Sequence, residues 1–322
     1  MDYSKVAILC GTLLTVAMEA SSKERESFSH WELFGDFVYL KRTDLHDMSI
    51  VKDSDDHTKI HTKDLIHSFD FEPGYRVGLF YSPNDKNSFE GNFLLVEDWK
   101  GRKKKQGDED LSFPFTSSTY DLDFTDADRA KAEYSSGFWD AELNYWRHFG
   151  PHGQEFFRLS GIVGLRFFHW DERFSLAMTT PPDTSTYTIH TENRILGAQL
   201  GLDFQMHPTR KICLELLAKV GGFANSTEQR QFLGDDDNTV SVRDSEKQQW
   251  QPGIFTDVEA QFGLQCTSWM NLHIGYEVLY LTGLALAPEQ ISKQVDSSAG
   301  KKDYTHGNAI VHGLFAGLKL NF

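Results

Sequence analysis

The chain has 322 residues and carries 32 lysines and arginines against 47 aspartates and glutamates, a formal net charge of −15. A net anion repels phosphate, so a nucleic-acid binder that works through broad basic attraction is excluded, and nucleic acid is not expected as a partner. With 39% hydrophobic and 13% aromatic residues the chain is not disordered. A mean hydropathy of −0.45, with no second apolar run of about 20 residues, excludes a helical membrane protein after the N-terminus but not a membrane β-barrel.

Residues 1–20 predict an export signal. Lys5 is a short basic element, residues 6–18 form an apolar run, and Ala20 lies where a cleavage site is expected. The alternative is a buried N-terminal helix. We therefore expect a cleaved signal peptide over residues 1–20, a short N-terminal segment over 21–30, and one domain over 31–322.

The mature chain repeats a two-residue period, which is typical of strands that present one apolar and one polar face. The clearest case is the last segment, where an apolar face runs from Ile310 to a terminal aromatic, Phe322. A soluble domain has no particular reason to end this way, whereas an outer-membrane barrel closes with such a strand. In chain order, the segments are 31–41, 75–81, 89–99, 139–146, 157–167, 196–206, 212–220, 254–265, 272–280 and 310–322.

Short connections alternate with long polar ones along the chain. Short ones fall near residues 82–87, 150–154, 207–211 and 266–270, and long ones near 43–70, 101–133, 171–190, 225–249 and 282–305. Short periplasmic turns and long extracellular loops are typical of bacterial barrels. The fold class expected is all-β: a transmembrane antiparallel β-barrel of about ten strands, within a range of roughly 8–12, in the bacterial outer membrane.

Aromatic residues near the strand ends indicate girdles at the membrane interfaces, where an apolar ring with a polar tip settles. The alternative is that tryptophan and tyrosine simply form good strands. The expected girdle is Trp31, Tyr81, Trp99, Tyr145, Trp170, Trp250, Tyr280 and Phe322.

Several segments resemble a known family. They are WELFGDFVYLKR, FEPGYRVGLFYSP, FRLSGIVGLRFFHW, LHIGYEVLYLTGLALAPEQI and the closing HGLFAGLKLNF. They are similar to the major-outer-membrane-protein type of pore-forming barrel found in some intracellular bacteria. This resemblance implies a porin-like outer-membrane protein that carries a signal peptide.

The alternation predicts a charged inner face. Its members are Asp36, Arg76, Asp140, Glu142, Arg158, Arg166, Asp203, Glu215, Lys219, Asp257, Glu259, Glu277 and Lys319. So many charges must be wet or paired, because an unpaired charge in a dry interior is prohibitively costly. About eight strands are just filled by side chains, so ten leave at most a narrow passage.

The function expected is a porin-like barrel giving narrow, cation-preferring passage to small solutes and ions. The alternative is a non-conducting barrel whose interior charges lock the fold and whose loops serve adhesion or partner binding. An outer-membrane enzyme is a distant alternative, since no nucleophile elbow, His-Glu-x-x-His motif or phosphate-binding glycine loop is present. His169, Asp171 and His190 are the one cluster that could serve catalysis, and we expect no enzyme and no cofactor.

Three further features were weighed. The acidic segment from Asp44 carries metal-ligand types, namely Asp53, Asp55, Asp56, His57, His61 and His67, but is expected to be a solvated stretch without metal. The run Arg102–Lys105 follows Trp99 and could hold anionic lipid headgroups at the outer surface, or could be a solvated charge run. Loss of the signal removes Cys10, and the remaining Cys213 and Cys266 fall at the same rim of neighbouring strands, where a disulfide forms only if their Cα atoms lie within roughly 7 Å.

Overall fold

The computed structural model describes residues 30–43, 46–114, 124–149, 156–235, 241–292 and 306–322. The expected signal peptide lies outside these residues, as do residues 21–29. The strands are β1 (His30–Thr43), β2 (Ser49–Lys52), β3 (Thr58–His61), β4 (Glu72–Asn84), β5 (Asn87–Val96), β6 (Trp99–Leu111), β7 (Ala127–Phe149), β8 (Phe157–Thr180), β9 (Asp183–Thr209), β10 (Ile212–Asp235), β11 (Ser241–Gln265), β12 (Met270–Leu284) and β13 (Gly307–Asn321). The helices described are α2 (Thr62–His67) and the single 3₁₀ turn η1 (Ala287–Gln290).

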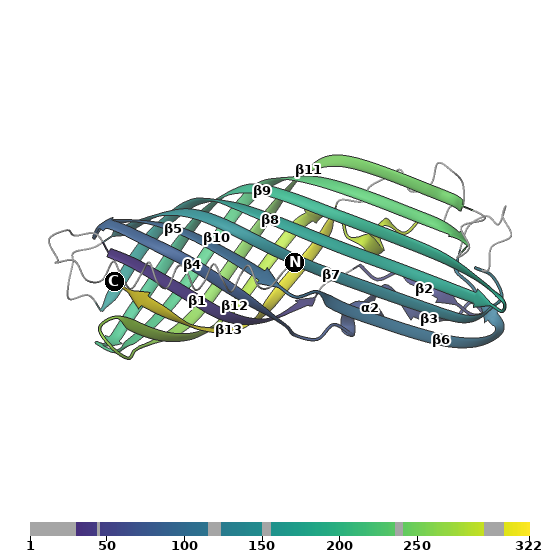
Figure 1. The fold of residues 1–322 in the computed structure, drawn as a ribbon, viewed down its shortest axis with the longest axis horizontal. Helices are drawn as coiled ribbons and strands as arrows, with labels where there is room; N and C mark the ends of the chain where they lie inside the picture. The colour runs from purple at the N-terminus through teal and green to yellow at the C-terminus, as the bar shows by residue number, and fades with distance from the viewer. Residues whose placement is uncertain (1–29, 44–45, 115–123, 150–155, 236–240, 293–305) are drawn as a thin grey trace.

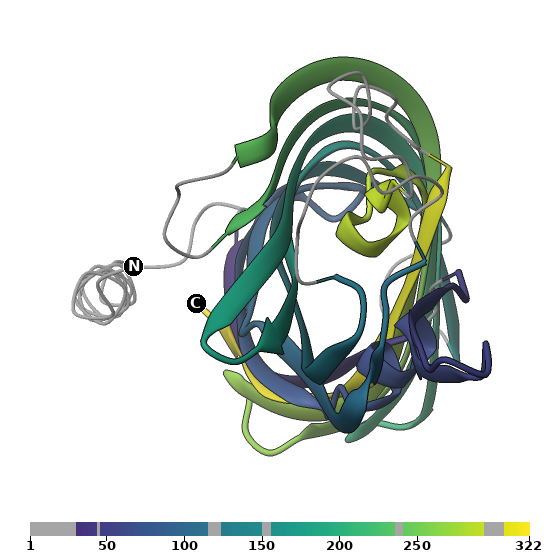
Figure 2. The ribbon, with the colours of Figure 1, turned by 90° about the vertical axis from the view of Figure 1, so that its right-hand side faces the viewer.

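The large sheet closes into a ring (Figures 1 and 2). Its strands pair antiparallel in the order β5, β4, β1, β13, β12, β11, β10, β9, β8, β7 and β6, and β5 also pairs with β7. Because β5 pairs with residues 139–147 of β7 and β6 with residues 127–136, these two strands share one position. The ring therefore has ten positions, which confirms the predicted antiparallel barrel of about ten strands.

The first and last strands of the barrel are neighbours. The Trp31 amide donates a hydrogen bond to the Phe322 carbonyl at 2.9 Å, and the Phe322 amide donates to the Trp31 carbonyl at 3.0 Å. Register then runs without a shift from Glu32 opposite Asn321 to Thr43 opposite Ile310. The alternation at the chain end thus completes the ring, as predicted.

The long strands reverse the chemistry of their two faces part-way along their length. In the first part of β8, Val163 and Leu165 point outward and are 50% and 55% exposed, while Arg166 points inward and is buried. Further along the same strand, Phe174 is fully buried and its neighbour Arg173 is exposed. We call the part of the barrel from the short turns to Trp139, Phe167, Leu196 and Ile254 the belt half, and the part of the barrel beyond them the polar half.

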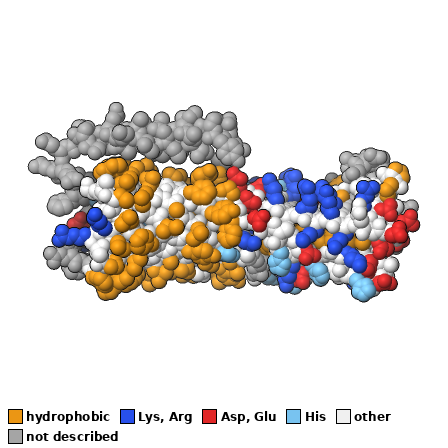
Figure 3. Space-filling view, turned by 90° about the horizontal axis from the view of Figure 1, so that it is seen from below, with side chains coloured by type: hydrophobic (Ala, Val, Ile, Leu, Met, Phe, Trp, Pro, Cys, Tyr) orange, Lys and Arg blue, Asp and Glu red, His pale blue; other side chains and the backbone are white. Residues whose placement is uncertain are grey.

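Figure 3 shows the consequence on the surface, an apolar band that ends abruptly at a region rich in charged side chains. The band is the surface that a β-barrel offers to lipid, and a polar surface beyond it is suited to water. In the polar half the apolar residues instead form an internal core. Its buried members include Trp99, Tyr134, Phe138, Phe168, Trp170, Phe174, Leu176, Met178, Tyr187, Ile189, Leu233 and Leu281.

Two of the predicted long loops are therefore largely strand. Residues 171–180 continue β8 and residues 183–190 begin β9, and residues 225–235 and 241–249 likewise extend β10 and β11. These polar segments lie beyond the apolar band, so their outward faces carry charge while their inward faces pack together. The prediction of loops over 171–190 and 225–249 was wrong for that reason, and the prediction of a loop over 101–133 was wrong for residues 101–111 and 127–133, which belong to β6 and β7.

A small lobe packs beside β6. It consists of β2, β3 and α2, and Ile50, Val51, Ile60, Leu65 and Ile66 form its buried apolar side. The α2 helix begins where Asp64 accepts a hydrogen bond from the His61 amide at 2.9 Å, a reciprocal cap of the helix start. None of the helices in the described ranges is long and apolar enough to cross a membrane.

Candidate functional site: the barrel interior

Most of the charged residues predicted for the inner face lie inside the ring. Asp36, Arg76, Asp140, Glu142, Arg166, Asp203, Lys219, Asp257 and Glu277 are buried. Glu215, Glu259 and Lys319 are half-buried. Arg158 is exposed, because it is the second residue of β8 and lies at the rim rather than in the interior.

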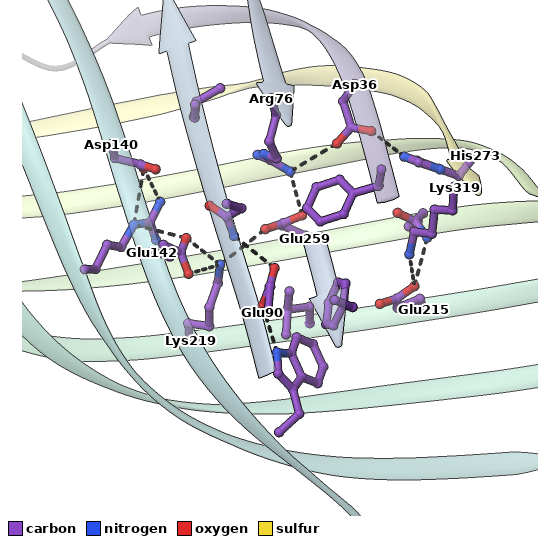
Figure 4. A pocket seen from close by; sticks show the side chains of 18 residues that line it. Asp36, Arg76, Glu90, Asp140, Glu142, Glu215, Lys219, Glu259, His273 and Lys319 are labelled. Carbon is purple, nitrogen blue, oxygen red and sulfur yellow. Dashed lines mark hydrogen bonds and ion pairs between the residues drawn. The ribbon is translucent and has the colours of Figure 1, made fainter. Parts of the chain in front are cut away.

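Arg166 and Lys219 occupy the centre of one ionic cluster, of which Figure 4 labels Lys219, Asp140 and Glu142. The Arg166 guanidinium donates to Asp140 Oδ2 and to Asp257 Oδ2, each at 2.6 Å. Lys219 Nζ donates to Glu142 Oε1 at 3.0 Å and lies 3.2 Å from Asp257 Oδ2. Asp140 is on β7 and Asp257 on β11, with three strands between them in the sheet, so these contacts cross the lumen.

Arg76 forms a second cluster that joins the first. Its guanidinium contacts Glu277 of β12, donates to Glu259 Oε2 of β11 at 3.1 Å, and lies 3.7 Å from Asp36 Oδ2 of β1. Glu259 also lies 3.6 Å from Lys219, so the two clusters form one network. Removing one partner from a buried ion pair leaves the other charge buried and uncompensated. Each member of the network therefore stabilises the charged form of its neighbours.

A chain of hydroxyl groups and a histidine lines the interior near the short turns. Ser82 and Ser88 Oγ atoms lie 2.7 Å apart, and His148 Nε2 lies 2.8 Å from Ser88 Oγ. The other ring nitrogen, His148 Nδ1, lies 2.9 Å from Ser160 Oγ. The chain links β4, β5, β7 and β8 side by side at this end of the barrel.

Among the described residues of the belt half, one small cavity lies in the interior. The cavity between the network, Phe34, Phe80 and Trp146 has a volume of about 50 Å³. A buried water needs roughly 10–15 Å³ by this measure, so the cavity holds a few waters. A hydrated solute does not fit in this space.

The polar half is filled in a different way, by residues 285–292, which we call the strap. In Figure 2 the strap, with η1, lies within the outline of the ring. The Ala285 amide donates to Asn193 Oδ1 at 2.8 Å, and Asn193 Nδ2 donates back to the Ala285 carbonyl at 3.0 Å. Asn225 Nδ2 donates both to Asn193 Oδ1 at 2.9 Å and to the Gly283 carbonyl at 3.0 Å.

Glu172 holds the middle of the strap. Its Oε2 accepts a hydrogen bond from the Ala287 amide at 2.8 Å, and its Oε1 accepts one from Trp170 Nε1 at 2.9 Å. The charge of Glu172 is balanced by Arg42, which lies at 2.5 Å and is itself fully buried. Buried amide and carboxylate groups from β8, β9 and β10 therefore satisfy the backbone of a segment that crosses the interior.

Several residues of the interior were not predicted from the sequence. Glu90 accepts hydrogen bonds from Trp146 Nε1 at 2.7 Å and Asn144 Nδ2 at 3.0 Å, and Gln199 Nε2 donates to Glu142 at 2.7 Å. Asn144 and Gln199 share the strand parity of the predicted Asp140 and Asp203, so extending the alternation to uncharged positions would have found them, whereas no inward residue was predicted on β5, where Glu90 lies. Glu172, Asn193 and Asn225 lay in or beside segments predicted as loops, and no signal pointed to them.

The eight residues predicted for the aromatic girdle differ in how far the structure exposes them. Trp31 and Trp250 point outward and are 38% and 67% exposed. Tyr81, Tyr145, Tyr280 and Phe322 are half-buried. Trp99 and Trp170 are fully buried, so their assignment to the girdle was wrong: both lie on the inward face of the polar half, where Trp99 Nε1 donates to the Leu40 carbonyl at 2.9 Å.

Cys213 and Cys266, the two cysteines among the described residues, are free thiols. They lie at the same end of the neighbouring strands β10 and β11, but Cys213 pairs with Gly263, three residues before Cys266. Three residues of extended chain span roughly 10 Å, which exceeds the reach of a disulfide of about 7 Å. The register therefore keeps the predicted pair apart.

Two groups of oxygen and nitrogen ligands come close enough together to suggest metal binding, but both are engaged by cations of the protein. Asp53, Asp55 and His57 lie within 4.8 Å of one another in the β2–β3 turn. Lys59 Nζ lies 2.6 Å from Asp53 Oδ2, and this hydrogen bond holds the pKa of the Asp53 carboxyl below its ordinary value. His61 and His67 lie apart from this turn, in β3 and α2.

The second group, Asp257, Glu259 and Glu277, also lies within 4.8 Å. Arg76 and Lys219 contact it directly, as described above. These carboxylates serve the ionic network, and a metal ion would have to displace its arginine and lysine partners.

The chain is similar to known proteins in its structure but not in its sequence. No family model and no curated protein matches the chain. Among solved structures, it is similar to the outer membrane protease OmpT from Escherichia coli, with 10% identity and a TM-score of 0.48 over 94% of this chain and 100% of that one. It is also similar to the translocator domain of the autotransporter NalP from Neisseria meningitidis, with 10% identity and a TM-score of 0.38 over 99% of this chain and 97% of that one. A third similar structure is Ail, the attachment invasion locus protein of Yersinia pestis, with 7% identity and a TM-score of 0.27 over 92% of this chain and 100% of that one.

Proposed function

We propose that this protein is a bacterial outer-membrane barrel that does not conduct solutes and that presents its polar half to a partner outside the cell. The observation that supports this proposal most directly is that side chains or backbone occupy the described interior in both the belt half and the polar half. The ionic network fills the belt half, and the strap with its surrounding core fills the polar half. Of the two functions that the sequence left open, the filled interior favours the non-conducting barrel.

The rigidity of the polar half is the second support. Strands β7 to β11 continue well beyond the apolar band and pair along nearly their full length. The strap and the core fix these strands from inside. A surface held this firmly loses little conformational entropy when a partner binds, which favours recognition.

A narrow, cation-preferring passage is the second candidate, and one observation favours it. Carboxylates outnumber basic groups among the described interior residues of the belt half. The acidic set is Asp36, Glu90, Asp140, Glu142, Asp203, Glu215, Asp257, Glu259 and Glu277, and the basic set is Arg76, Arg166, Lys219 and Lys319. Passage of even small cations would require the network to open, because the cavity of about 50 Å³ holds only a few waters.

Conductance of the full chain, refolded into a planar bilayer, separates the two functions. We expect no current steps from the wild-type protein. Steps that shrink when Asp257→Asn and Glu259→Gln are combined would contradict the proposal and favour the passage. A circular-dichroism spectrum and the unfolding midpoint of each sample establish that silence comes from folded protein.

We further propose that the protein is not an enzyme. His190 Nε2 lies 2.6 Å from Asp171 Oδ2, so the histidine and aspartate that could have served catalysis do meet. They meet on the outward face of β8 and β9, within a lattice of surface charges, and this position suits a structural ion pair. Incubation of the refolded protein with unstructured peptides and with phospholipid, followed by mass spectrometry, tests this expectation, and turnover lost in His190→Ala would contradict it.

A further inference from the structure

The outer wall of the polar half carries a repeated pattern of charges on three neighbouring strands. Each strand places a histidine or serine, an acidic residue and an arginine at successive outward positions. The three sets are His169, Asp171 and Arg173 on β8, His190, Glu192 and Arg194 on β9, and Ser226, Glu228 and Arg230 on β10. The register brings Asp171, Glu192 and Glu228 into one row across the strands.

Most of these charges are paired within the lattice. Arg194 donates two hydrogen bonds to the Glu192 carboxylate at 2.7 and 2.9 Å, and Arg230 donates to Glu228 at 2.6 Å. Asp171 is paired with His190, as described above. Arg173 is different, because its exposed guanidinium makes no hydrogen bond or ion pair with any described residue, and it interacts with the Asp171 carboxylate on the same face only electrostatically.

A second unpaired basic group lies close to Arg173. Ser135 of β7 pairs with Arg173 on one side and with Lys100 of β6 on the other. Lys100 is also exposed and, within the described part of the chain, forms no hydrogen bond or ion pair, and its electrostatic interaction is with the Glu72 carboxylate. Facing residues on adjacent strands have Cβ atoms roughly 5 Å apart, so Lys100 and Arg173 flank Ser135 closely enough for both long side chains to reach one anion above it.

This position lies just beyond the apolar band. Ser135 is four residues along β7 from Trp139, which corresponds to roughly 13 Å of strand and about 10 Å of height at the tilt of a membrane barrel. The Trp139 ring stacks on His169, with ring centroids 5.5 Å apart, and marks the edge of the band. Lipid headgroups occupy the layer directly outside the hydrocarbon, so Lys100 and Arg173 lie at their level.

An apolar hollow lies in the band directly below Trp139. Gly91, Phe93, Ala141, Leu143 and Leu165 are among its lining residues, and its volume is about 610 Å³. It is open because Gly91 and Ala141 carry little or no side chain where their neighbours carry leucine or phenylalanine. A hollow of this chemistry on a lipid-facing wall suits a hydrocarbon chain.

We propose that Lys100, Ser135 and Arg173 bind the phosphate of an outer-leaflet lipid whose acyl chain occupies the hollow at Gly91 and Ala141. The inference rests on the proposed orientation of the polar half toward the outside of the cell, but it does not depend on whether the barrel conducts. It also differs from the sequence-based expectation for Arg102–Lys105. Arg102 is ion-paired with Glu133, and Lys103 to Lys105 lie further along β6, away from the band.

The proposal is tested by lipid binding to the full chain in detergent micelles, counted by native mass spectrometry. The probe is a doubly phosphorylated, acylated glucosamine disaccharide (lipid A). We expect the combined Lys100→Gln and Arg173→Gln variant to bind it at least about tenfold more weakly than wild type. Arg230→Gln is the matched control, because its guanidinium is already held by Glu228, and we expect it to bind within about twofold of wild type.

The hollow has its own variant and its own control ligand. A Cβ at Gly91 would meet only ordinary contacts, the nearest being Leu143 Cδ2 at 3.5 Å, so the backbone accepts a side chain here and Gly91→Leu directs one toward the hollow. We expect this variant to weaken binding of lipid A, and the same lipid without its phosphates to bind weakly to the wild type. Equal binding by the Lys100/Arg173 variant, or glucosamine 1-phosphate binding as tightly as the lipid, would overturn the proposal, and an unchanged unfolding midpoint shows that each variant is folded.

Discussion

Inside the polar half, the Asn193 side chain forms two hydrogen bonds with the backbone of Ala285: its Nδ2 donates to the Ala285 carbonyl, and its Oδ1 accepts from the Ala285 amide. Asn193 is fully buried on β9, and Ala285 lies just after β12, at the start of the strap. An amide side chain that pairs in this way imitates a neighbouring strand at a point where the ring of strands provides none. The fold of the polar half therefore depends on side chains as well as on sheet pairing.

Asn193→Ala should release the strap. The substitution leaves the Ala285 amide and carbonyl without partners, at a cost of about 1–3 kcal/mol in the free energy of unfolding. Cleavage after Glu289 by a glutamate-specific protease, followed over time, measures the release, and we expect faster cleavage in the variant. Gln248→Ala, at an exposed position of β11, is the control. If the protease cleaved Asn193→Ala and wild type at equal rates, other contacts would hold the strap.

The interior network makes a separate prediction about stability. Arg166→Met removes the ion-pair partner of Asp140 and leaves Glu142 and Asp257 with Lys219 alone, so we expect the free energy of unfolding to fall by about 3–5 kcal/mol. Adding Asp257→Asn should restore part of the loss, because it removes one of the carboxylates that then share Lys219. Urea unfolding of the protein in lipid vesicles, followed by tryptophan fluorescence, measures both values.

Arg230→Met is the control for this experiment. Its ion pair with Glu228 is on the surface, and surface pairs contribute at most about 1 kcal/mol. If Arg166→Met were no more costly than Arg230→Met, the interior would be hydrated in solution and the case for a passage would gain weight.

The cysteines test the register between β10 and β11. We expect both Cys213 and Cys266 to react with a thiol reagent in protein that has never been reduced, with exposed Cys266 reacting faster than half-buried Cys213. Peptide mapping after alkylation identifies each site. A peptide in which the two are joined would mean that Cys213 and Cys266 approach more closely than their register allows.

Much of the belt half was predictable because lipid imposes a simple rule on it. Outward positions such as Val163 and Leu165 must be apolar, so a two-residue period is visible in the sequence and gives the strand count. The partners within the lumen were not predictable. Arg76 and Glu277 are far apart in the chain and meet only because ring closure places β4 and β12 on a common interior, and a charge at an inward position does not indicate which charge lies opposite.

The strands of the polar half were not predicted, because their apolar residues point inward and their polar residues outward, the reverse of the belt half. Along β8 the inward residues Phe174, Leu176 and Met178 are apolar and buried, and the outward residues beside them are Arg173, Ser175, the small Ala177 and Thr179. The strand parity is the same as in the belt half, but apolar residues move from the outward to the inward face once lipid is replaced by water. A search for a lipid-facing stripe therefore ends at Phe167, and the rest resembles a polar loop.

This reversal predicts how single lysine substitutions along β8 should behave. In the belt half, Leu165→Lys places a charge in lipid and should cost about 2–4 kcal/mol if it lies near the middle of the bilayer. In the polar half, Ser175→Lys points to water and should change the free energy of unfolding by less than about 0.5 kcal/mol. Leu176→Lys, one residue further, buries a charge in an apolar core and should prevent folding or cost several kcal/mol.

The measurement is the unfolding free energy of the three variants in lipid vesicles, with the folded fraction of each read from its heat-modifiable migration on gels. The decisive comparison is between adjacent residues. If Ser175→Lys were as damaging as Leu176→Lys, both faces of β8 would be covered at that height. A tolerated Leu176→Lys would mean that the interior of the polar half is open to water, and the filled interior on which the non-conducting function rests would then be wrong.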